Sequence, residues 1–410
     1  MAANPIKSTQ NDAAQKMFED AAAMQRQGNH KGAIKRFKRL LKQAPDHPQL
    51  LNMCALSLAE TGDMRNAEKL LERALKADPE NGERWGNFGL FLQKVGKLPE
   101  AVDAYDRFRT LNPDAAMAHL KYADACHELE RYADALPAYE AAVELDGSDA
   151  DAWRNLARVR MFEGKWANAL EASDRALALH PGNTQVLSFK SVAQAELGRE
   201  DEVNTLVDFD RLVEVVDLSA PEGFADMAAF NDAVCAHALA HPSLEFEPEG
   251  KSTRHGHQST NLAEGDQGPI APLLAMIEQA VAAYRTSHDA DAGHDFLAQR
   301  PDEWDIYIWA TVLDSEGHQA AHLHPSGWLS GVYYARVPDV VAANPESEDG
   351  WIEFGRAAKY PHAQAEHSVK TYQPREGRVV LFPSYFYHRT IPFESDTQRI
   401  SIAFDLVPRV

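Results

Sequence analysis

The amino-terminal half of the sequence repeats itself every 34 residues. Prolines recur at this interval at Pro45, Pro79, Pro113 and Pro181, with Gly147 at the intervening position. A second series consists of glycines and is interrupted only by Glu130: Gly28, Gly62, Gly96, Gly164 and Gly198. A third series consists of alanines: Ala33, Ala67, Ala101, Ala135 and Ala169. A unit of this length holds two helices, with a glycine in the turn between them and a proline ending the second. The period therefore predicts an α-solenoid over residues 13–216.

Large side chains follow four residues after the first four alanines, at Phe37, Leu71, Tyr105 and Tyr139. With these residues in place, the pattern resembles tetratricopeptide repeats over residues 13–216. It departs from that pattern at Glu130, Ser173 and Val203, and the unit around residues 183–216 looks like a capping unit. The resemblance implies a concave surface that binds a protein or peptide. The alternative is an array that packs against its own second domain or pairs two copies of the chain as a homodimer.

Charge and length narrow the classes of partner. A chain of 410 residues is too long for one compact core, so we expect at least two domains. The net charge is −21, and residues 201–350 carry 6 basic against 27 acidic residues. An acidic balance of this size argues against a nucleic-acid partner, whose phosphates it would repel.

The sequence offers no sign of a membrane or secretory segment. No stretch approaches the roughly 18 to 20 apolar residues that cross a bilayer, and the first residues, MAANPIKSTQNDAAQ, lack the apolar core of a signal peptide. The three cysteines, Cys54, Cys126 and Cys235, lie far apart and form no disulfide framework. These features favour a cytoplasmic protein without a membrane partner.

The periodicity changes after a short Pro- and Gly-containing segment, DLSAPEGF (217–224), which we interpret as a linker. Residues 225–410 form the predicted second domain. Helical spacing covers 224–240 and 270–285, and a polar loop is expected at 251–268, between them. From residue 304 the apolar segments become short, β-branched and aromatic: WDIYIWATVL, GWLSGVYYARV, GWIEF, SVKTY, GRVVLF and QRISIAFDLV. These segments predict an antiparallel sandwich or barrel braced by the preceding helices.

Two histidines stand one residue apart just before the most strand-like segment. On an extended backbone, the side chains of His322 and His324 point to the same side. A third histidine, His388, ends the strand-like run RVVLFPSYFYH, and Arg399 follows eleven residues later. His255 and His257 share the H-x-H spacing but lie in the expected polar loop without a distal partner, so we interpret them as part of a mobile or substrate-facing loop.

This constellation resembles the 2-oxoglutarate- and Fe(II)-dependent oxygenases, over residues 225–410 and most specifically over 318–404. The resemblance implies a double-stranded β-helix, a jelly-roll or cupin-like fold, that uses Fe(II), 2-oxoglutarate and O2. It implies that His322, His324 and His388 bind the metal, with His324 at the position of the usual Asp or Glu. It also implies that Arg399 pairs with the far carboxylate of 2-oxoglutarate, assisted by Tyr334 and Ser401.

The histidine at position 324 makes the expected site a three-histidine site, one charge more positive than usual in the family. The resulting hypothesis is a dioxygenase, an oxidoreductase that hydroxylates a protein or peptide side chain presented by the repeats. One alternative is a Zn(II) hydrolase or lyase built on the same histidines, and another is a non-catalytic adaptor. Ser330 in GWLSG does not fit the G-x-S-x-G pattern of a hydrolase nucleophile.

Overall fold

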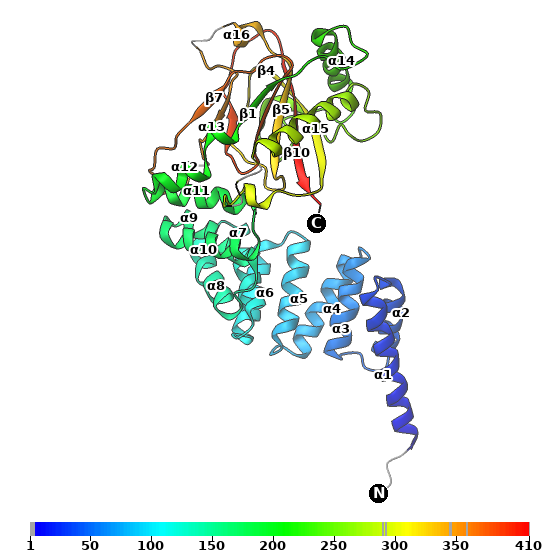
Figure 1. Cartoon of the computed structure of the whole chain (residues 1–410). Coiled ribbons are helices and arrows are strands. Elements are labelled where there is room, and N and C mark those ends of the chain that lie inside the picture. Colours follow the sequence, from blue (N-terminus) through cyan, green and yellow to red (C-terminus); the bar gives the residue numbers. More distant parts are fainter. Residues whose placement is uncertain (1–4, 289–290, 292, 344–346, 358–359, 410) are drawn as a thin grey trace. The chain divides into compact units, whose positions relative to one another are not determined.

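The computed structural model describes residues 5–288, 291, 293–343, 347–357 and 360–409. The chain divides into two compact units, Met1–Val159 and Arg160–Val410. Each unit is described by itself below, and Figure 1 gives the labels of the elements. Within the described part of the chain, every helix is too short or too polar to span a membrane.

The first unit consists of successive helices that pack against their neighbours in the sequence. They are drawn from blue through cyan to blue-green in Figure 1. The helices are α1 (Pro5–Arg26), α2 (His30–Leu41), α3 (Pro48–Glu60), α4 (Met64–Ala77), α5 (Gly82–Lys94), α6 (Leu98–Leu111), α7 (Ala116–Glu128), α8 (Tyr132–Leu145) and α9 (Ala150–Phe162). The two-helix unit that the 34-residue period predicts is thus confirmed.

The glycine series lies in the turns between paired helices. Gly62 and Gly96 have φ angles of 86° and 76°, in the left-handed region that side chains disfavour. Glu130, the one departure from the series, also has a positive φ of 57°. The repeat backbone is therefore kept at this position despite a cost of roughly 1 kcal/mol for a non-glycine residue. The five alanines of the third series are all fully buried between helices.

The second unit combines the last repeat helices with the β domain. Its helices are α10 (Trp166–Leu179), α11 (Thr184–Glu196), α12 (Glu200–Leu206), α13 (Phe209–Leu212), α14 (Met227–Ala240), α15 (Ile270–Ser287), a 3₁₀ turn (Leu297–Gln299) and α16 (Asp339–Ala342). Leu187, Leu206 and Phe209 from the repeat helices are buried in the same cluster as residues of the sheets. The predicted boundaries at residues 216 and 224 separate a repeat domain, a linker and a β domain that would each fold by itself. They stay a prediction.

Two antiparallel sheets form the β domain. The strands are β1 (Glu214–Asp217), β2 (Glu245–Phe246), β3 (Thr253–Gln258), β4 (Trp304–Gln319), β5 (Leu329–Arg336), β6 (Ile352–Phe354), β7 (Lys370–Tyr372), β8 (Arg378–Pro383), β9 (His388–Thr390) and β10 (Arg399–Pro408). The larger sheet has the order β1-β8-β5-β10-β4-β3-β2, and the smaller has the order β7-β6-β9. The predicted fold class, a repeat solenoid followed by a double-stranded β-helix domain with bracing helices, is confirmed.

The larger sheet has one apolar face and one face rich in polar groups. On β10, the residues Ile400, Ile402, Phe404 and Leu406 belong to the buried apolar cluster that includes α14 and α15. The alternate residues, Arg399, Ser401, Ala403 and Asp405, point to the opposite face. Figure 1 shows α14 and α15 beside this sheet, and the opposite face carries the site described below.

Two local predictions were wrong. Residues 253–258 form strand β3 instead of continuing a polar loop, because they pair with β4 and bury Thr253 and Gln258. A Cβ on Gly256 would lie only 2.5 Å from the carbonyl oxygen of Val312, so only glycine allows this approach of the two strands. His388 begins the short strand β9 instead of ending the preceding one, because the chain turns after β8 ends at Pro383.

Candidate metal centre

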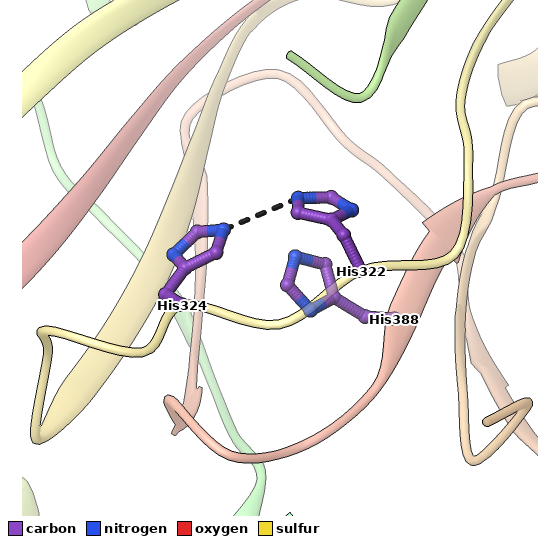
Figure 2. Close-up of side chains that lie close together, drawn as sticks. All are labelled: His322, His324 and His388. Atoms are coloured by element: carbon purple, nitrogen blue, oxygen red, sulfur yellow. Dashed lines mark hydrogen bonds between the residues drawn. The ribbon is translucent and has the colours of Figure 1, made fainter. Parts of the chain in front are cut away.

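Three histidines from two distant segments meet at the polar face of the larger sheet. His322 and His324 lie just before β5, and His388 lies at the start of β9, as Figure 2 shows. One ring nitrogen from each histidine lies within 4.8 Å of the other two. The Nε2 atoms of His322 and His324 are 3.2 Å apart. The three histidines that the sequence singled out are therefore brought together.

The second ring nitrogen of each histidine already has an acceptor. Nδ1 of His322 lies 2.8 Å from the carbonyl oxygen of Ala320, and Nδ1 of His388 lies 3.0 Å from that of Phe386. A carbonyl oxygen only accepts hydrogen bonds, so both Nδ1 atoms must carry the proton. Nδ1 of His324 contacts the Oδ1 carboxylate atom of Asp405. All three Nε2 atoms are thus left with a lone pair, as metal coordination requires.

Burial keeps the imidazoles of His322 and His388 neutral. It lowers the pKa of His322 to about 3, and the neighbouring His324 acts in the same direction. It also holds the pKa of His388 well below the usual range of histidine, as do the two other rings. Two neutral Nε2 lone pairs only 3.2 Å apart repel each other unless a cation lies between them. Two imidazole nitrogens bound to one metal ion at about 2.1 Å lie roughly 3 Å apart, so the residues present fit a metal ion.

A buried guanidinium lies on the same face of the sheet. Arg399, at the start of β10, is 2% exposed. Its Nη1 lies 3.4 Å from Oγ1 of Thr390, two residues after His388, and its Nε has no hydrogen-bond partner among the described residues. Burial lowers the pKa of Arg399, and the ionisable side chain of Tyr334 opposes this shift. A buried cation without a carboxylate partner is costly, which points to an anionic ligand.

Two buried hydroxyls without a hydrogen-bond partner among the described residues lie on the same face of the sheet as this guanidinium. The Tyr334 ring centroid lies 5.0 Å from the guanidinium carbon of Arg399, and burial raises the pKa of Tyr334. The hydroxyls of Tyr334 and Thr311 are buried and lack a hydrogen-bond partner in the part of the chain that the structure describes. Ser401 is paired with Thr311 on β4 and with Tyr334 on β5, so the three side chains share one face. The proposed co-substrate residues Arg399, Tyr334 and Ser401 thus lie together.

Sequence reasoning missed Asp405 and Thr311. Asp405 contacts the outer nitrogen of His324, and Thr311 lies beside Ser401. The sequence held a signal for Asp405, because residues 399 and 405 are six apart on one strand and must point to the same face. A charged residue with this alternation in an otherwise apolar strand was the clue. Thr311 had no comparable signal, since threonine is common in strands.

The remaining candidates lie outside this group. His255 and His257 lie on and beside the β3 bulge, where their Nδ1 atoms are each 3.8 Å from a carboxylate oxygen of β4 residues Glu316 and Asp314. The group of three described metal-ligating side chains contains neither of them. The Ser330 hydroxyl lies 2.6 Å from Oδ1 of Asp405, 2.7 Å from the Ser384 hydroxyl and 3.0 Å from Nδ1 of His324, the ring nitrogen that points away from the other two histidines. It therefore supports the site instead of acting as a nucleophile.

Family models match both parts of the chain. Residues 307–405 match the family described as "Putative 2OG-Fe(II) oxygenase". Residues 24–88 match one tetratricopeptide-repeat model, and residues 88–150 and 128–184 match another. No curated protein matches the chain significantly.

Three of the similar solved structures are MamA, PilF and YrrB. The crystal structure of MamA protein is 23% identical, with 39% of this chain and 88% of that chain covered and a TM-score of 0.37. PilF of Pseudomonas aeruginosa is 16% identical, with 49% of this chain and 92% of that chain covered and a TM-score of 0.42. YrrB, described as a TPR protein with an unusual peptide-binding site, is 20% identical. The match covers 46% of this chain and 97% of that chain, with a TM-score of 0.38. The family models and the geometry of the β domain lead to one conclusion: this chain is a fusion of tetratricopeptide repeats with a domain that matches the 2OG-Fe(II) oxygenase family.

Proposed function

We propose that the protein is an Fe(II)- and 2-oxoglutarate-dependent dioxygenase that hydroxylates a side chain of a protein or peptide. The observation that carries the proposal is the pairing of two features on one sheet face. Three histidine Nε2 lone pairs converge at one point. The buried guanidinium of Arg399, which has no carboxylate partner among the described residues, lies near the strand that carries one of these histidines. A metal-chelating dicarboxylate satisfies both features at once.

In this proposal His322, His324 and His388 hold the metal ion on one side. Three neutral imidazoles leave the other coordination positions free for an oxo acid and O2. Bound Fe(II) would supply the coupling of O2 activation to oxidative decarboxylation of 2-oxoglutarate. The protein's own part is to hold these groups in place with fixed tautomers and fixed ring orientations.

Arg399 would bind the far carboxylate of 2-oxoglutarate through its planar fork of donors. The hydroxyls of Tyr334 and Thr311, which lack a hydrogen-bond partner among the described residues, would donate to the same carboxylate, and Ser401 is paired with both residues. Such a contact would remove the desolvation cost that three buried polar groups carry without a ligand. The carboxylate-binding group formed by Arg399, Tyr334 and Thr311 distinguishes the proposed dioxygenase from a zinc hydrolase, which has no need of a buried guanidinium at this place.

Around His388 the protein excludes water with aromatic side chains. The rings of Phe382 and Phe354 lie 4.7 and 6.0 Å from the ring of His388. On the other side, a cavity of about 400 Å³ is lined by His322, His324 and Trp309, among others. This cavity gives a substrate side chain a route to the metal position.

The repeats are proposed to select the protein or peptide substrate. Tetratricopeptide repeats generally mediate protein–protein interaction, and the first unit exposes the apolar side chains of Leu90 and Met117, at 51% and 54%. A bound peptide would cover such side chains. We keep this as a proposal about the class of partner.

A turnover assay on the full chain tests the activity. With Fe(II), O2 and 2-oxoglutarate, the protein should release succinate and CO2 slowly even without its substrate, and Arg399→Met should strongly reduce this release when 2-oxoglutarate is limiting. A protein that binds metal yet releases no succinate, and that hydrolyses esters when loaded with Zn(II), would favour the zinc alternative. A metal-binding protein that neither releases succinate nor hydrolyses esters would favour the non-catalytic adaptor.

A further inference from the structure

The carboxylate of Asp405 is buried beside the candidate metal centre. Its side chain is 14% exposed, and it contacts Nδ1 of His324, whose side chain is 11% exposed. Within the described part of the chain, its ion-pair partners include no lysine or arginine. Burying an anion costs several kcal/mol unless a positive charge compensates it. A metal ion on the far side of the His324 ring would supply that charge.

Asp405 is held in this position by Ser330, which is in turn held by Ser384. Ser330, its cross-strand partner on β5, donates a hydrogen bond of 2.6 Å to Oδ1. Ser384 lies 2.7 Å from the Ser330 hydroxyl, and its carbonyl oxygen accepts the backbone N–H of His324 at 3.0 Å. A Cβ on Gly327 would lie 2.6 Å from Oγ of Ser384, so the loop after His324 closes tightly on this network. The network thus fixes both partners of the His324–Asp405 contact.

The three outer partners of the histidines differ in charge. His322 and His388 donate to neutral backbone carbonyls, whereas His324 donates to a carboxylate. His324 also occupies the position at which the related oxygenases place an Asp or Glu. The negative charge is therefore absent from residue 324 but is present on Asp405, which contacts the outer nitrogen of the His324 ring. A hydrogen-bonded carboxylate raises the basicity of a histidine ligand and fixes its tautomer.

We propose that Asp405 is a positioning residue that acts through His324, holding its Nδ1–H tautomer and supplying to the metal the negative charge that the three-histidine set lacks. This inference rests on the proposed metal site but not on the oxygenase chemistry. It makes two separate claims, one about the free protein and one about its metal affinity.

The first claim is tested without metal, on the full chain labelled with ¹⁵N-histidine. Ring-nitrogen NMR signals of His324, identified by their loss in His324→Gln, should report the Nδ1–H tautomer in the metal-free protein. In Asp405→Asn the tautomer should become mixed, because an amide can present either an oxygen or an NH₂ group to Nδ1. An Nε2–H tautomer in the unsubstituted protein would overturn the inference, even if no Asp405 variant folds.

The second claim is tested by a double-mutant cycle on Co(II) affinity. Asp405→Asn should weaken Co(II) binding by about tenfold to a hundredfold, yet change it little in a His324→Ala background. Equal losses in both backgrounds would show that Asp405 does not act through His324 and would overturn the inference. Asp305→Asn is the matched control, since Asp305 pairs with Arg409 at the surface and should leave Co(II) affinity unchanged.

The two proposals fail in different ways. A chain that shows the Nδ1–H tautomer and the cycle's coupling, but turns over no 2-oxoglutarate with Fe(II), would retain Asp405 as a positioning residue and overturn the dioxygenase. Turnover combined with additive Co(II) losses would retain the dioxygenase and overturn the role of Asp405.

Discussion

His322 and His388 are joined by an antiparallel bridge in which each residue's backbone N–H donates to the other's carbonyl oxygen at 3.0 Å. The bridge ties the segment before β5 to the first residue of β9, although the two lie 66 positions apart in the sequence. Their rings face each other with centroids 4.3 Å apart. The backbone therefore brings the two side chains together before any metal contributes.

Loss of one imidazole should remove the metal from the site. We expect His388→Ala to lower metal retention from about one Fe(II) per chain to near zero under stoichiometric conditions, because two histidines alone bind Fe(II) weakly. The measurement is metal analysis after anaerobic gel filtration. His257→Ala is the control, since His257 lies outside the group of three and should retain the metal. Equal metal contents in the two variants would contradict the assignment.

Arg399 should determine the affinity for the co-substrate and not for the metal. Arg399→Ala should raise the 2-oxoglutarate concentration needed for half-saturation by about tenfold to a hundredfold, because a charge-assisted pair contributes roughly 1.5–3 kcal/mol. Fe(II) affinity should stay unchanged. Arg409→Ala, at an exposed arginine, is the matched control. An unaltered 2-oxoglutarate requirement in Arg399→Ala would assign the carboxylate to another residue.

Those residues of the candidate site that follow a spacing pattern in the sequence could be predicted. The H-x-H spacing and the arginine offset are local patterns, and together with the distal histidine they singled out His322, His388 and Arg399. The repeats were predictable for the same reason, since their period repeats the same local structure. Asp405 and strand β3 were not predicted, because both depend on contacts with strands far away in the sequence. Burial of Leu187 and Phe209 with the β sheets is likewise a tertiary fact that periodicity cannot show.

Acid should weaken the smaller sheet through Glu353. Burial alone would raise the pKa of Glu353, but hydrogen bonds from Arg389 on β9 and from Arg356 lower it to about 2. A carboxyl whose pKa is lowered on folding contributes stability that is present above its unfolded pKa of about 4.5 and is lost as the pH falls toward 2.

We therefore expect Glu353→Gln to destabilise the second unit at pH 6, with a loss that shrinks as the pH falls below about 4.5. Guanidinium unfolding of both proteins between pH 6 and pH 3 measures this difference. Glu316→Gln, at an exposed carboxylate, should show no such difference. A Glu353→Gln effect that stayed constant over this pH range would argue against the two arginine contacts as its cause.

The last repeat helices should be needed for the β domain to fold. A chain starting at residue 160 keeps β1 and the buried residues Leu187, Leu206 and Phe209, whereas one starting at residue 218 loses all of them. Removing several buried side chains costs about 2–5 kcal/mol for each, so we expect the shorter chain to lack a cooperative thermal transition by circular dichroism. Equal melting temperatures for the two chains would instead support a domain boundary near residue 217.

The metal held by the three histidines and the guanidinium of Arg399 are proposed to bind the same molecule of 2-oxoglutarate. Anaerobic titration of the full chain with Fe(II) and 2-oxoglutarate tests it most directly, by the weak visible charge-transfer absorption of the chelate. We predict that the absorption appears only when both are present, saturates at about one 2-oxoglutarate per chain, and is absent in His388→Ala. No absorption from a protein that retains one Fe(II) and binds 2-oxoglutarate would contradict the account.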